Sequence, residues 1–465
     1  MDYYGLLYPV YKNIIRVRNN YIMKDLTKGK PSVLILSFAL PVFLANLLQL
    51  TYSIVDTRIV GTFLGENMLA AVGSTTTLSN LIIGFLLGLS NGFAIVTAQK
   101  FGARDIKAVK KSFAAALIMG VSIALIITAA GLIFLWPILK FLNIPQDLSG
   151  EASAYISVII AGLIATFLYD MCAAVLRAIG DTITPLIILA VSVMLNVAGD
   201  IFFVVILKEG VRGAAIATVL AQFIAFVVCA VYMVKKYDIL RLTKQDFKGI
   251  NGSMFKNMLG GGLSMGFMSS LVNIGSLTLQ TAINKLGQDI IVAHTAARKI
   301  SEIFMIMFTV FGQTMATYCG QNIGAGEVER VKKGIKLSIF YTCIWCTLAM
   351  IASYTIGDWL VHLVTGSSNY AVIKNATDYL KFDSIFYYVT AVICIVRNAM
   401  QGLGEHITPL VSSSLEMIGK IIIAATLVPV MGYTGVILAE PIVWFIMVIP
   451  LLVKIYRMPV LKENY

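Results

Sequence analysis

The chain is a succession of apolar stretches, each about as long as a helix that crosses a membrane. Of its 465 residues, 58% are hydrophobic and 13% are charged, against roughly 25% charged residues in an ordinary soluble domain. A soluble fold of this size needs more polar surface, so a soluble enzyme, a secreted disulfide scaffold and a disordered chain are excluded. A bilayer core of about 30 Å requires about 20 apolar residues per helix. The pattern therefore predicts an all-α polytopic membrane protein with twelve transmembrane helices. The expected spans are 33–55, 68–98, 113–136, 152–176, 186–207, 213–234, 257–283, 290–320, 335–357, 376–396, 407–429 and 435–453.

Lysine and arginine residues gather on one side of the predicted spans. The two tails and the loops on their side hold 26 of them, the opposite side holds nine with Arg298 and Lys299 included, and Lys420 lies inside a span. By the positive-inside rule both termini are cytoplasmic, which requires an even number of spans. This topology also accounts for the net charge of +12, so we expect no nucleic acid partner.

The second half of the chain repeats the first. Gln99–Lys111 recurs as Gln321–Lys333, 222 residues later; GDTITP (Gly180–Pro185) recurs as GEHITP (Gly404–Pro409), 224 later; Gly210 and Gly213 recur as Gly432 and Gly435, 222 later. Three matches in one order indicate two parallel six-span halves, pseudo-symmetric lobes around a central substrate cavity. The expected parts are a cytoplasmic tail 1–30, an N-lobe 31–234, a cytoplasmic loop 235–256, a C-lobe 257–453 and a cytoplasmic tail 454–465.

Three glycines are spaced by four along the second predicted span. Gly84, Gly88 and Gly92 leave one side of this helix without side chains. Such stripes of small residues let membrane helices approach closely. We therefore expect these glycines to serve packing and to have no chemical role.

The chain lacks the signatures of catalytic and nucleotide-hydrolysing proteins. Its three histidines, His294, His362 and His406, form no HExxH motif and do not lie beside a CxxC pair. The sequence also has no Walker A loop, which excludes ATP hydrolysis by that route. We therefore expect a protein that is not an enzyme, has no catalytic residues and no cofactor, and draws on an ion gradient.

Several ionisable residues fall inside the apolar spans, where a charge is costly and marks a functional candidate. Asp200 in the fifth span has Asn196 one turn earlier on the same face. Asp56 ends the first span and is either a functional acid or a helix-end carboxylate at the headgroups. Asp170 in the fourth span is either functional or held in a water-filled vestibule. Pro41, inside the first span, is expected to kink that helix.

The last two spans hold a second group of charges. Glu416 and Lys420 are four residues apart and can pair on one face of the eleventh span. Either this pair is structural and closes the C-lobe cavity, or Lys420 is a tethered cation that keeps the C-lobe neutralised. Glu440, near the start of the twelfth span, is a further intramembrane acid.

Three segments of the chain carry a family pattern. They are LPVFLANLLQLTYSIVDTRIVGTFLG, LRAIGDTITPLIILAVSVMLNVAGD followed by GVRGAAIATVLAQ, and RNAMQGLGEHITP. From about Met23 to Tyr456 the chain resembles the multidrug and toxin extrusion (MATE) family. The usual opening of the family looks like MKDLTKGKP, which begins here at Met23. We therefore expect residues 1–22 to be an extension or the product of an upstream start codon.

The resemblance implies a cation site in the N-lobe. Its hinge falls on Pro41, and its cation-coupling residues fall on Asp56, Asn196, Asp200, Thr218 and Tyr155. Carboxylate, amide and hydroxyl oxygens suit Na⁺, for which Asp56, Asn196, Asp200 and Thr218 are the expected ligands, and two close carboxylates can instead carry a proton. The same oxygens serve either ion, so H⁺ and Na⁺ remain alternatives.

The second half departs from the family pattern. The counterparts of Asp56 and Asp200 are Thr278 and Ala424, so a second cation site is not expected there. Asp170, Glu416 and Lys420 are the residues expected to line the substrate cavity.

The function that this implies is secondary active antiport. The chain is expected to export amphipathic, often cationic organic compounds, such as drugs and toxins, in exchange for H⁺ or Na⁺ by alternating access. The alternative is a flippase for lipid-linked oligosaccharides or other lipids from the same superfamily. A flippase needs a strongly cationic cavity, and Lys420 is the one basic residue expected mid-span. The expected partners are small organic substrates and membrane lipid, with the chain a monomer in the cytoplasmic membrane of a prokaryote.

Overall fold

The computed structural model of the chain is built from helices. It describes residues 24–142 and 144–462, so the segment 1–22 discussed above lies outside the described residues. The helices of the first half are α2 (Pro31–Leu64), α3 (Glu66–Gly102), α4 (Ile106–Ile133), α5 (Leu135–Phe141), α6 (Gln146–Ala161), α7 (Leu163–Ala178), α8 (Ile183–Asp200), the π-helix η1 (Ile201–Ile206), α9 (Gly210–Lys236) and the short η2 (Asp238–Leu240). Those of the second half are α10 (Gly252–Ile283), α11 (Gln288–Gly324), α12 (Val328–Thr355), α13 (Gly357–Thr365), α14 (Tyr370–Ile385), α15 (Tyr387–Gly402), α16 (Ile407–Met431), α17 (Tyr433–Arg457) and η3 (Pro459–Leu461).

The described helices account for twelve membrane spans. Ten are single helices of sufficient length and apolar character, and two more are bent pairs, α6 with α7 at 45° and α14 with α15 at 54°. The bends lie at Gly162 and Phe386, which are 224 residues apart, as are the GDTITP and GEHITP loops. At Gly162 a Cβ would lie 2.2 Å from the Val219 side chain of α9, so the close approach of α9 requires glycine. The prediction of an all-α membrane protein with twelve spans is confirmed.

The chain divides into two compact units. Of the described residues, unit 1 comprises 24–83, 96–142, 144–256 and 324–326, and unit 2 comprises 84–95, 257–323 and 327–462. The middle of α3, residues 84–95, thus packs with the second half of the chain. The loop after α9 belongs with unit 1, where Lys111 Nζ of α4 donates to the Gly249 carbonyl at 3.1 Å.

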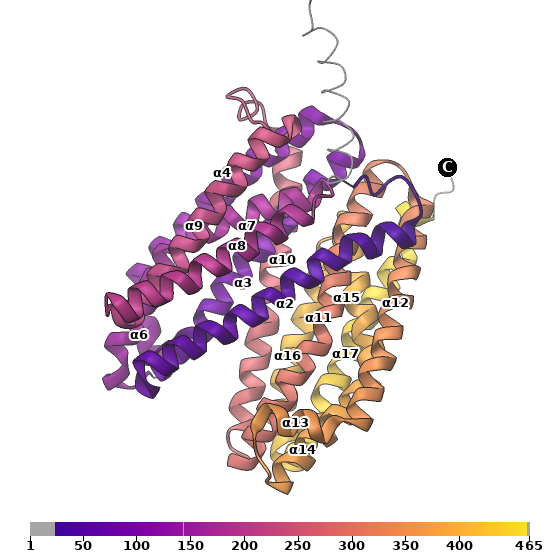
Figure 1. Cartoon of the computed structure of the whole chain (residues 1–465). Helices are drawn as coiled ribbons and strands as arrows, with labels where there is room; N and C mark the ends of the chain where they lie inside the picture. Colours follow the sequence, from indigo (N-terminus) through magenta and orange to yellow (C-terminus); the bar gives the residue numbers. More distant parts are fainter. Residues whose placement is uncertain (1–23, 143, 463–465) are drawn as a thin grey trace, which may run out of the picture. The chain divides into compact units, whose positions relative to one another are not determined.

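In unit 1, four helices of the first half pack side by side. α7 contacts α4 and α9, and α9 in turn contacts α8, as Figure 1 shows. The first span, α2, lies against α8 and also touches α9. This arrangement brings residues from four separate spans of unit 1 together.

The two repeated loops are built alike. In unit 1 the Asp181 carboxylate accepts from the Thr184 backbone N–H at 3.0 Å and from the Tyr237 hydroxyl at 2.7 Å. In unit 2 Glu405 accepts from the Thr408 backbone N–H at 3.1 Å and pairs with Lys454 at 3.0 Å. Each acid therefore caps one helix and ties it to the end of the next span, which explains why the acid recurs.

Helix α2 continues through Pro41 without interruption. Proline has no N–H, so the carbonyl of Ser37, four residues earlier, has no donor within the helix. Lys24 Nζ donates to this carbonyl at 3.0 Å. The segment before α2 therefore supplies the hydrogen bond that Pro41 removes.

The α3 glycines pack against α10 within unit 2. A Cβ at Gly88 would lie 2.5 Å from the Met265 carbonyl oxygen, and one at Gly92 would lie 2.5 Å from the Gly261 carbonyl oxygen. At Gly84 the nearest atom would be 3.8 Å away, an ordinary contact. The expected packing role of the stripe is confirmed for Gly88 and Gly92.

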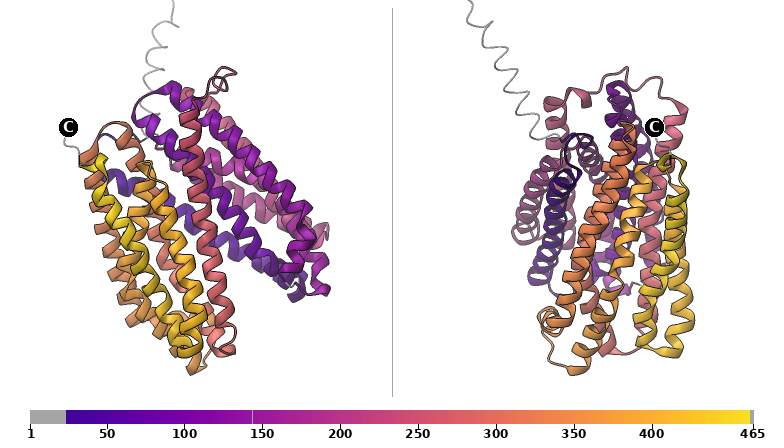
Figure 2. Two further views of the ribbon diagram at one scale, coloured as in Figure 1. Left: turned by 180° about the vertical axis from the view of Figure 1, so that it is seen from behind. Right: turned by 90° about the vertical axis from the view of Figure 1, so that its right-hand side faces the viewer.

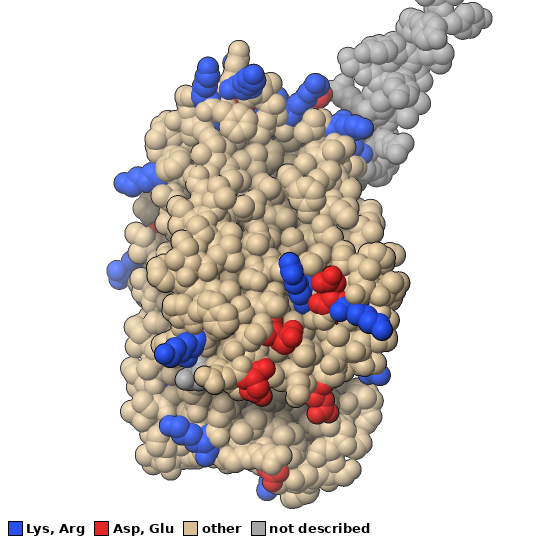
Figure 3. All heavy atoms as spheres, turned by 90° about the vertical axis from the view of Figure 1, so that its left-hand side faces the viewer, with Lys and Arg blue, Asp and Glu red and all other residues tan. Residues whose placement is uncertain are grey.

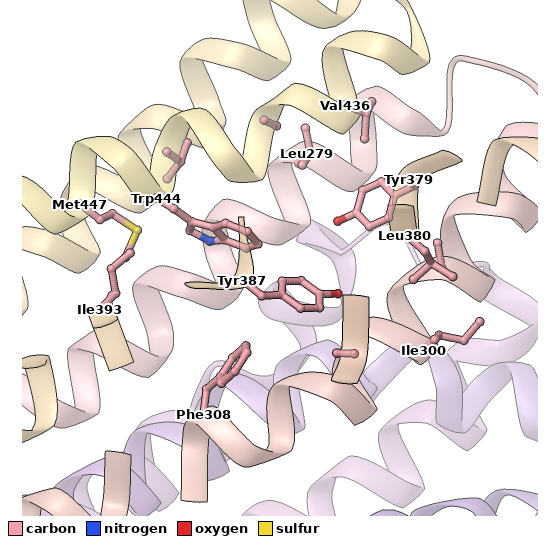
Figure 4. Close-up of a cluster of buried hydrophobic side chains, with 14 of the residues drawn as sticks. Leu279, Ile300, Phe308, Tyr379, Leu380, Tyr387, Ile393, Val436, Trp444 and Met447 are labelled. Carbon is pink, nitrogen blue, oxygen red and sulfur yellow. The ribbon is translucent and has the colours of Figure 1, made fainter. Parts of the chain in front are cut away.

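Unit 2 has a large apolar core to which all its helices from α10 to α17 contribute, among them α12, α15, α16 and α17. These four helices run alongside one another in both views of Figure 2, in agreement with the contacts of α15 with α12 and α17 and of α17 with α16. Tyr387 lies between Phe308 and Trp444 (Figure 4), with ring centroids 5.9 and 6.3 Å away. Its hydroxyl donates to Ser301 at 3.1 Å. Buried polar groups thus lie directly beside this core.

Large apolar side chains cover much of the outer surface. Ile126, Phe141 and Val430 are 67, 84 and 84% exposed, which is unfavourable in water and favourable in lipid. On the face drawn in Figure 3, uncharged residues form most of the surface, and several lysine and arginine side chains gather at its upper end. This surface suits a protein embedded in a bilayer.

Candidate functional site

A polar cluster in unit 1 joins residues from α2, α6, α8 and α9. Asn196 Nδ2 donates to the Thr218 hydroxyl at 3.2 Å, and Thr218 in turn donates to the Ala214 carbonyl at 3.1 Å. The carboxyl groups of Asp56 and Asp200 interact electrostatically with each other and with the phenol of Tyr155. The structure therefore brings together all five residues predicted to couple a cation.

Four oxygens of this cluster lack hydrogen-bond donors. Asp200 is fully buried and Asn196 is 3% exposed. Both carboxylate oxygens of Asp200, Oδ1 of Asp56 and the amide oxygen of Asn196 are buried without a hydrogen-bond partner. Buried polar atoms in proteins are nearly always satisfied, so these four oxygens are unusual, and by their chemistry they can accept a cation or a proton.

The backbone at Asp200 departs from an ordinary α-helix. Helix α8 ends at Asp200, and the next six residues, Ile201–Ile206, form the π-helix η1. Single π-helical turns are rare and occur frequently at functional sites. In unit 2 the corresponding helix, α16, is α-helical from Ile407 to Met431. The irregular turn thus accompanies the buried acid and has no counterpart in α16.

Tyr52 also belongs to the unit 1 cluster, and the sequence analysis did not include it. Its hydroxyl lies 3.3 Å from that of Thr218, and its phenol interacts with Asp56, Tyr155 and Asp200. The available signal was its spacing, because residues four apart share a helix face and Tyr52 precedes Asp56 by four.

Pro41 lies away from this cluster along α2. Fifteen residues of α-helix separate it from Asp56, which corresponds to about 22 Å at 1.5 Å per residue. Any influence of Pro41 on the cluster must therefore act through the helix.

Asp170 lies in a different setting, on α7. Its carboxylate interacts with the guanidinium of Arg177, two turns later on the same helix, and with the phenol of Tyr169. Asp56 and Asp200 are not among the groups that act on it. The structure therefore separates Asp170 from the predicted coupling residues and gives it a cation as neighbour.

The predicted pair of Glu416 and Lys420 is part of a larger ion network in unit 2. Lys420 Nζ lies 2.9 Å from Glu416 Oε1 and 3.1 Å from Glu440 Oε1. Glu440 Oε1 also pairs with the guanidinium of Arg298 at 3.2 Å. The two contacts of Lys420 are shielded, since Lys420, Glu416 and Glu440 are 2, 6 and 5% exposed, whereas the Arg298 side chain is 28% exposed.

Arg298 was counted with the basic residues on the side opposite the termini, although it falls within the predicted span 290–320. It lies in the eleventh position of the 37-residue helix α11, facing α17 through its ion pair with Glu440. Lys420 is therefore not the one basic residue within the spans. The predicted span 290–320 already contained Arg298, so its place within a span could be read from the sequence.

Asp383 is a buried acid that the sequence analysis overlooked. It lies in α14, is fully buried, and neither carboxylate oxygen has a hydrogen-bond partner. Its charge interacts with Glu440, Arg298 and Lys420. Tyr379, one turn earlier, interacts with Asp383, Arg298 and Glu440. A count of ionisable residues within the predicted span 376–396 identifies this position.

A polar cavity of about 240 Å³ opens beside the unit 2 network. Its lining comes from the last turns of α10, from α11 and from α17: Ser276, Leu279, Gln280, Ile283, His294, Thr295, Arg298, Lys299, Glu302 and Glu440. Two of these residues, Arg298 and Glu440, belong to the ion network. The network is therefore in contact with a cavity and is not sealed in the apolar core.

Comparison with known proteins identifies the family of the chain. The sequence profile of the MatE family matches residues 41–202 and 265–427. The probable multidrug resistance protein YpnP of Bacillus subtilis is 25% identical over 83% of this chain and 86% of its own length. The multidrug export protein MepA of Staphylococcus aureus is 22% identical over 86% of this chain and 88% of its own.

The fold of the chain is also similar to that of solved transporter structures. A solved structure described as the outward-facing conformation of a multidrug resistance MATE family transporter of the MOP superfamily superposes with a TM-score of 0.87, covering 95% of this chain and 98% of that one at 21% identity. Two profile matches, one in each half, correspond to the internal repeat. With more than half of the chain matched, the protein belongs to the MatE family of membrane transporters and is not an enzyme.

Proposed function

We propose that the chain is a secondary antiporter that exports amphipathic, often cationic organic compounds in exchange for H⁺ or Na⁺. The observation that supports this most directly is the unit 1 cluster, in which Asp56 and Asp200 present buried oxygens without donors. Two charged carboxylates buried side by side are costly. Binding of a proton or a Na⁺ ion removes this cost, so the cluster has reason to load an ion from one side of the membrane.

Coupling follows if the loaded and empty clusters favour different conformations. Asp56 lies on α2, while Asp200 and Thr218 lie on α8 and α9, so an ion shared between these carboxylates joins separate helices. In alternating access, two lobes rearrange about a binding region. We assign these roles to the N-lobe, 31–234, and the C-lobe, 257–453, with the expelled compound moving in the opposite direction to the ion.

The export of organic compounds is supported by the names of two relatives, both called multidrug proteins. The flippase alternative is less well supported, because Arg298 and Lys420 are each paired with a carboxylate. Neither is available to form a strongly cationic cavity for a pyrophosphate group. We further assign the chain, as a monomer with both termini cytoplasmic, to the cytoplasmic membrane of a prokaryote, in contact with membrane lipid.

The decisive experiment measures transport in reconstituted vesicles. Efflux of a fluorescent organic cation is followed first under an imposed pH gradient with no Na⁺, and then under an imposed Na⁺ gradient at equal pH. Efflux under one gradient identifies the coupling ion. Absence of gradient-dependent efflux for cationic, neutral and anionic dyes alike contradicts the antiporter assignment.

A further inference from the structure

The ammonium group of Lys420 is enclosed by three oxygen atoms. They are Glu416 Oε1 at 2.9 Å, Glu440 Oε1 at 3.1 Å and the Ser276 hydroxyl at 3.3 Å. A lysine ammonium has three donors and no acceptor, so these oxygens match its capacity. They come from α16, α17 and α10, and together form a compact oxygen site for one monovalent cation.

This oxygen site lies at positions that correspond to the unit 1 cluster. Lys420 follows Asn196 by 224 residues, and Glu440 follows Thr218 by 222, the offsets of the neighbouring repeat matches. Asn196 donates to Thr218 at 3.2 Å, and Lys420 contacts Glu440 at 3.1 Å. The two pairs are therefore equivalent, with an amide and a hydroxyl in unit 1 replaced by an ammonium and a carboxylate in unit 2.

We propose that Lys420 is a covalently attached cation that permanently fills the unit 2 counterpart of the unit 1 cation site. The charges favour this assignment, since Lys420 and Arg298 face Glu416 and Glu440, with Asp383 also close to Arg298. The oxygens of Glu416, Glu440 and Ser276 are then occupied by the lysine ammonium, so a free cation is not admitted at this position of unit 2. Exchange of the coupling ion is confined to the cluster of Asp56 and Asp200, a consequence that rests on the proposed antiport.

The aliphatic part of the Lys420 side chain is closely packed against α10. Gly275 lies beside its aliphatic stem, and a Cβ there would be 3.2 Å from Lys420 Cδ and 3.1 Å from Met417 Cα. At the other end, Ser276 and Glu440, which contact the ammonium, also line the 240 Å³ cavity. Truncation of Lys420 should therefore leave a space shaped for a linear ammonium ion, with an entrance from the cavity.

The test is rescue of a truncated lysine by a free amine. Lys420→Ala removes three carbon atoms and the ammonium, which n-propylammonium replaces atom for atom. The unfolding temperature of the purified protein is measured with increasing n-propylammonium and, as the uncharged control, n-propanol. The variant is also made in a background of Asp56→Asn and Asp200→Asn, so that cations bound in unit 1 do not contribute.

The proposal expects saturable stabilisation of Lys420→Ala by the amine, in both backgrounds, and none by propanol. The protein with Lys420 intact should not respond in the neutralised background. Glu416→Gln combined with Lys420→Ala removes one oxygen charge and should weaken binding of the amine at least tenfold. Lys454→Ala is the matched control, because Lys454 also pairs with a glutamate but is about half exposed.

Several results overturn the proposal. They are a stable Lys420→Ala protein that does not respond to the amine, an equal response with Glu416→Gln added, and a response in the neutralised background of the protein that retains Lys420. Failure to obtain Lys420→Ala even with the amine present during purification also contradicts it, because the amine should then fill the site. None of these measurements uses transport, so a failure here is distinguishable from a failure of the antiporter assignment.

Discussion

Asn196 and Thr218 are joined across two helices by a hydrogen bond of 3.2 Å, from the amide of α8 to the hydroxyl of α9. The same hydroxyl lies 3.3 Å from that of Tyr52 on α2. Thr218 thus connects three helices around Asp56 and Asp200 without carrying a charge itself.

Thr218→Val keeps the shape of the side chain and removes these hydrogen bonds. We expect a loss of about 1–3 kcal/mol in stability, because the buried amide of Asn196 loses its acceptor, and weaker binding of the coupling ion. Thr218→Ser should retain both properties. Chemical unfolding and titration of the ion measure them, and wild-type values for Thr218→Val would show that the hydroxyl is dispensable.

Asp56→Asn and Asp200→Asn should each abolish gradient-driven export in vesicles while the protein still inserts. Each change leaves one carboxylate, which cannot load and release an ion as the pair does. Asp147→Asn is the control, since this acid lies exposed in the first turn of α6, and it should retain coupling. Wild-type efflux by either of the first two variants would remove the unit 1 cluster from the mechanism.

Pro41→Ala should slow transport with little loss of ion binding. The alanine N–H restores a hydrogen bond within α2 and stiffens the segment between Ser37 and Asp56. Lys24→Gln tests the same carbonyl from outside, because Lys24 Nζ now supplies its donor. Its effect should be clear with Pro41 present and small in the Pro41→Ala background. Equal effects of Lys24→Gln in both backgrounds would contradict the link.

Lys420→Met should be more harmful than Glu416→Gln. Loss of the lysine leaves Glu416 without its cation, and removal of one partner of a buried ion pair costs about 3–5 kcal/mol. Glu416→Gln leaves Lys420 paired with Glu440 at 3.1 Å, so its cost should be smaller. The double variant should recover much of the stability lost by Lys420→Met. Unfolding measurements on the three variants decide this, and equal losses in the two single variants would contradict the ranking.

Gly92→Ala should destabilise unit 2, whereas Gly84→Ala should be tolerated. At Gly92 the new Cβ would lie 2.5 Å from a backbone oxygen, and backbone on both helices must move to admit it, whereas at Gly84 the nearest atom is 3.8 Å away. Unfolding temperatures of the two variants give the comparison. Similar values would mean that α3 and α10 do not approach as closely as described.

The spans were predictable because each helix that crosses a bilayer needs a long apolar run, and such runs can be recognised directly in the sequence. The unit 1 residues were predictable because acids within such helices are rare, and family resemblance added Thr218 and Tyr155. The bends at Gly162 and Phe386 were not predictable. A hydropathy profile sums the polarity of side chains and carries no information on the direction of the helix axis. Phe386 has no feature that explains its bend.

The unit 2 network was only partly predictable, for a different reason. Glu416 and Lys420 share a helix, so their spacing of four was sufficient. Glu440 and Arg298 come from two other helices, α17 and α11, and their meeting depends on tertiary packing that no local pattern encodes. Asp383 was overlooked although the predicted span contained it.

The π-helical turn after Asp200 can be related to the history of the repeat. The offset between the halves is 224 at Gly180 and 222 at Gly210, so the first half has two more residues between these matches than the second. The extra length coincides with η1 and the short connection Leu207–Glu209. A π-turn accommodates more residues than an α-turn, so the added length alters the backbone after Asp200 and leaves the helix before it unchanged. The two halves therefore differ at this acid in chain length as well as in residue type. An alignment of the halves without gaps pairs Asp200 with its counterpart but shifts the residues after it by two positions.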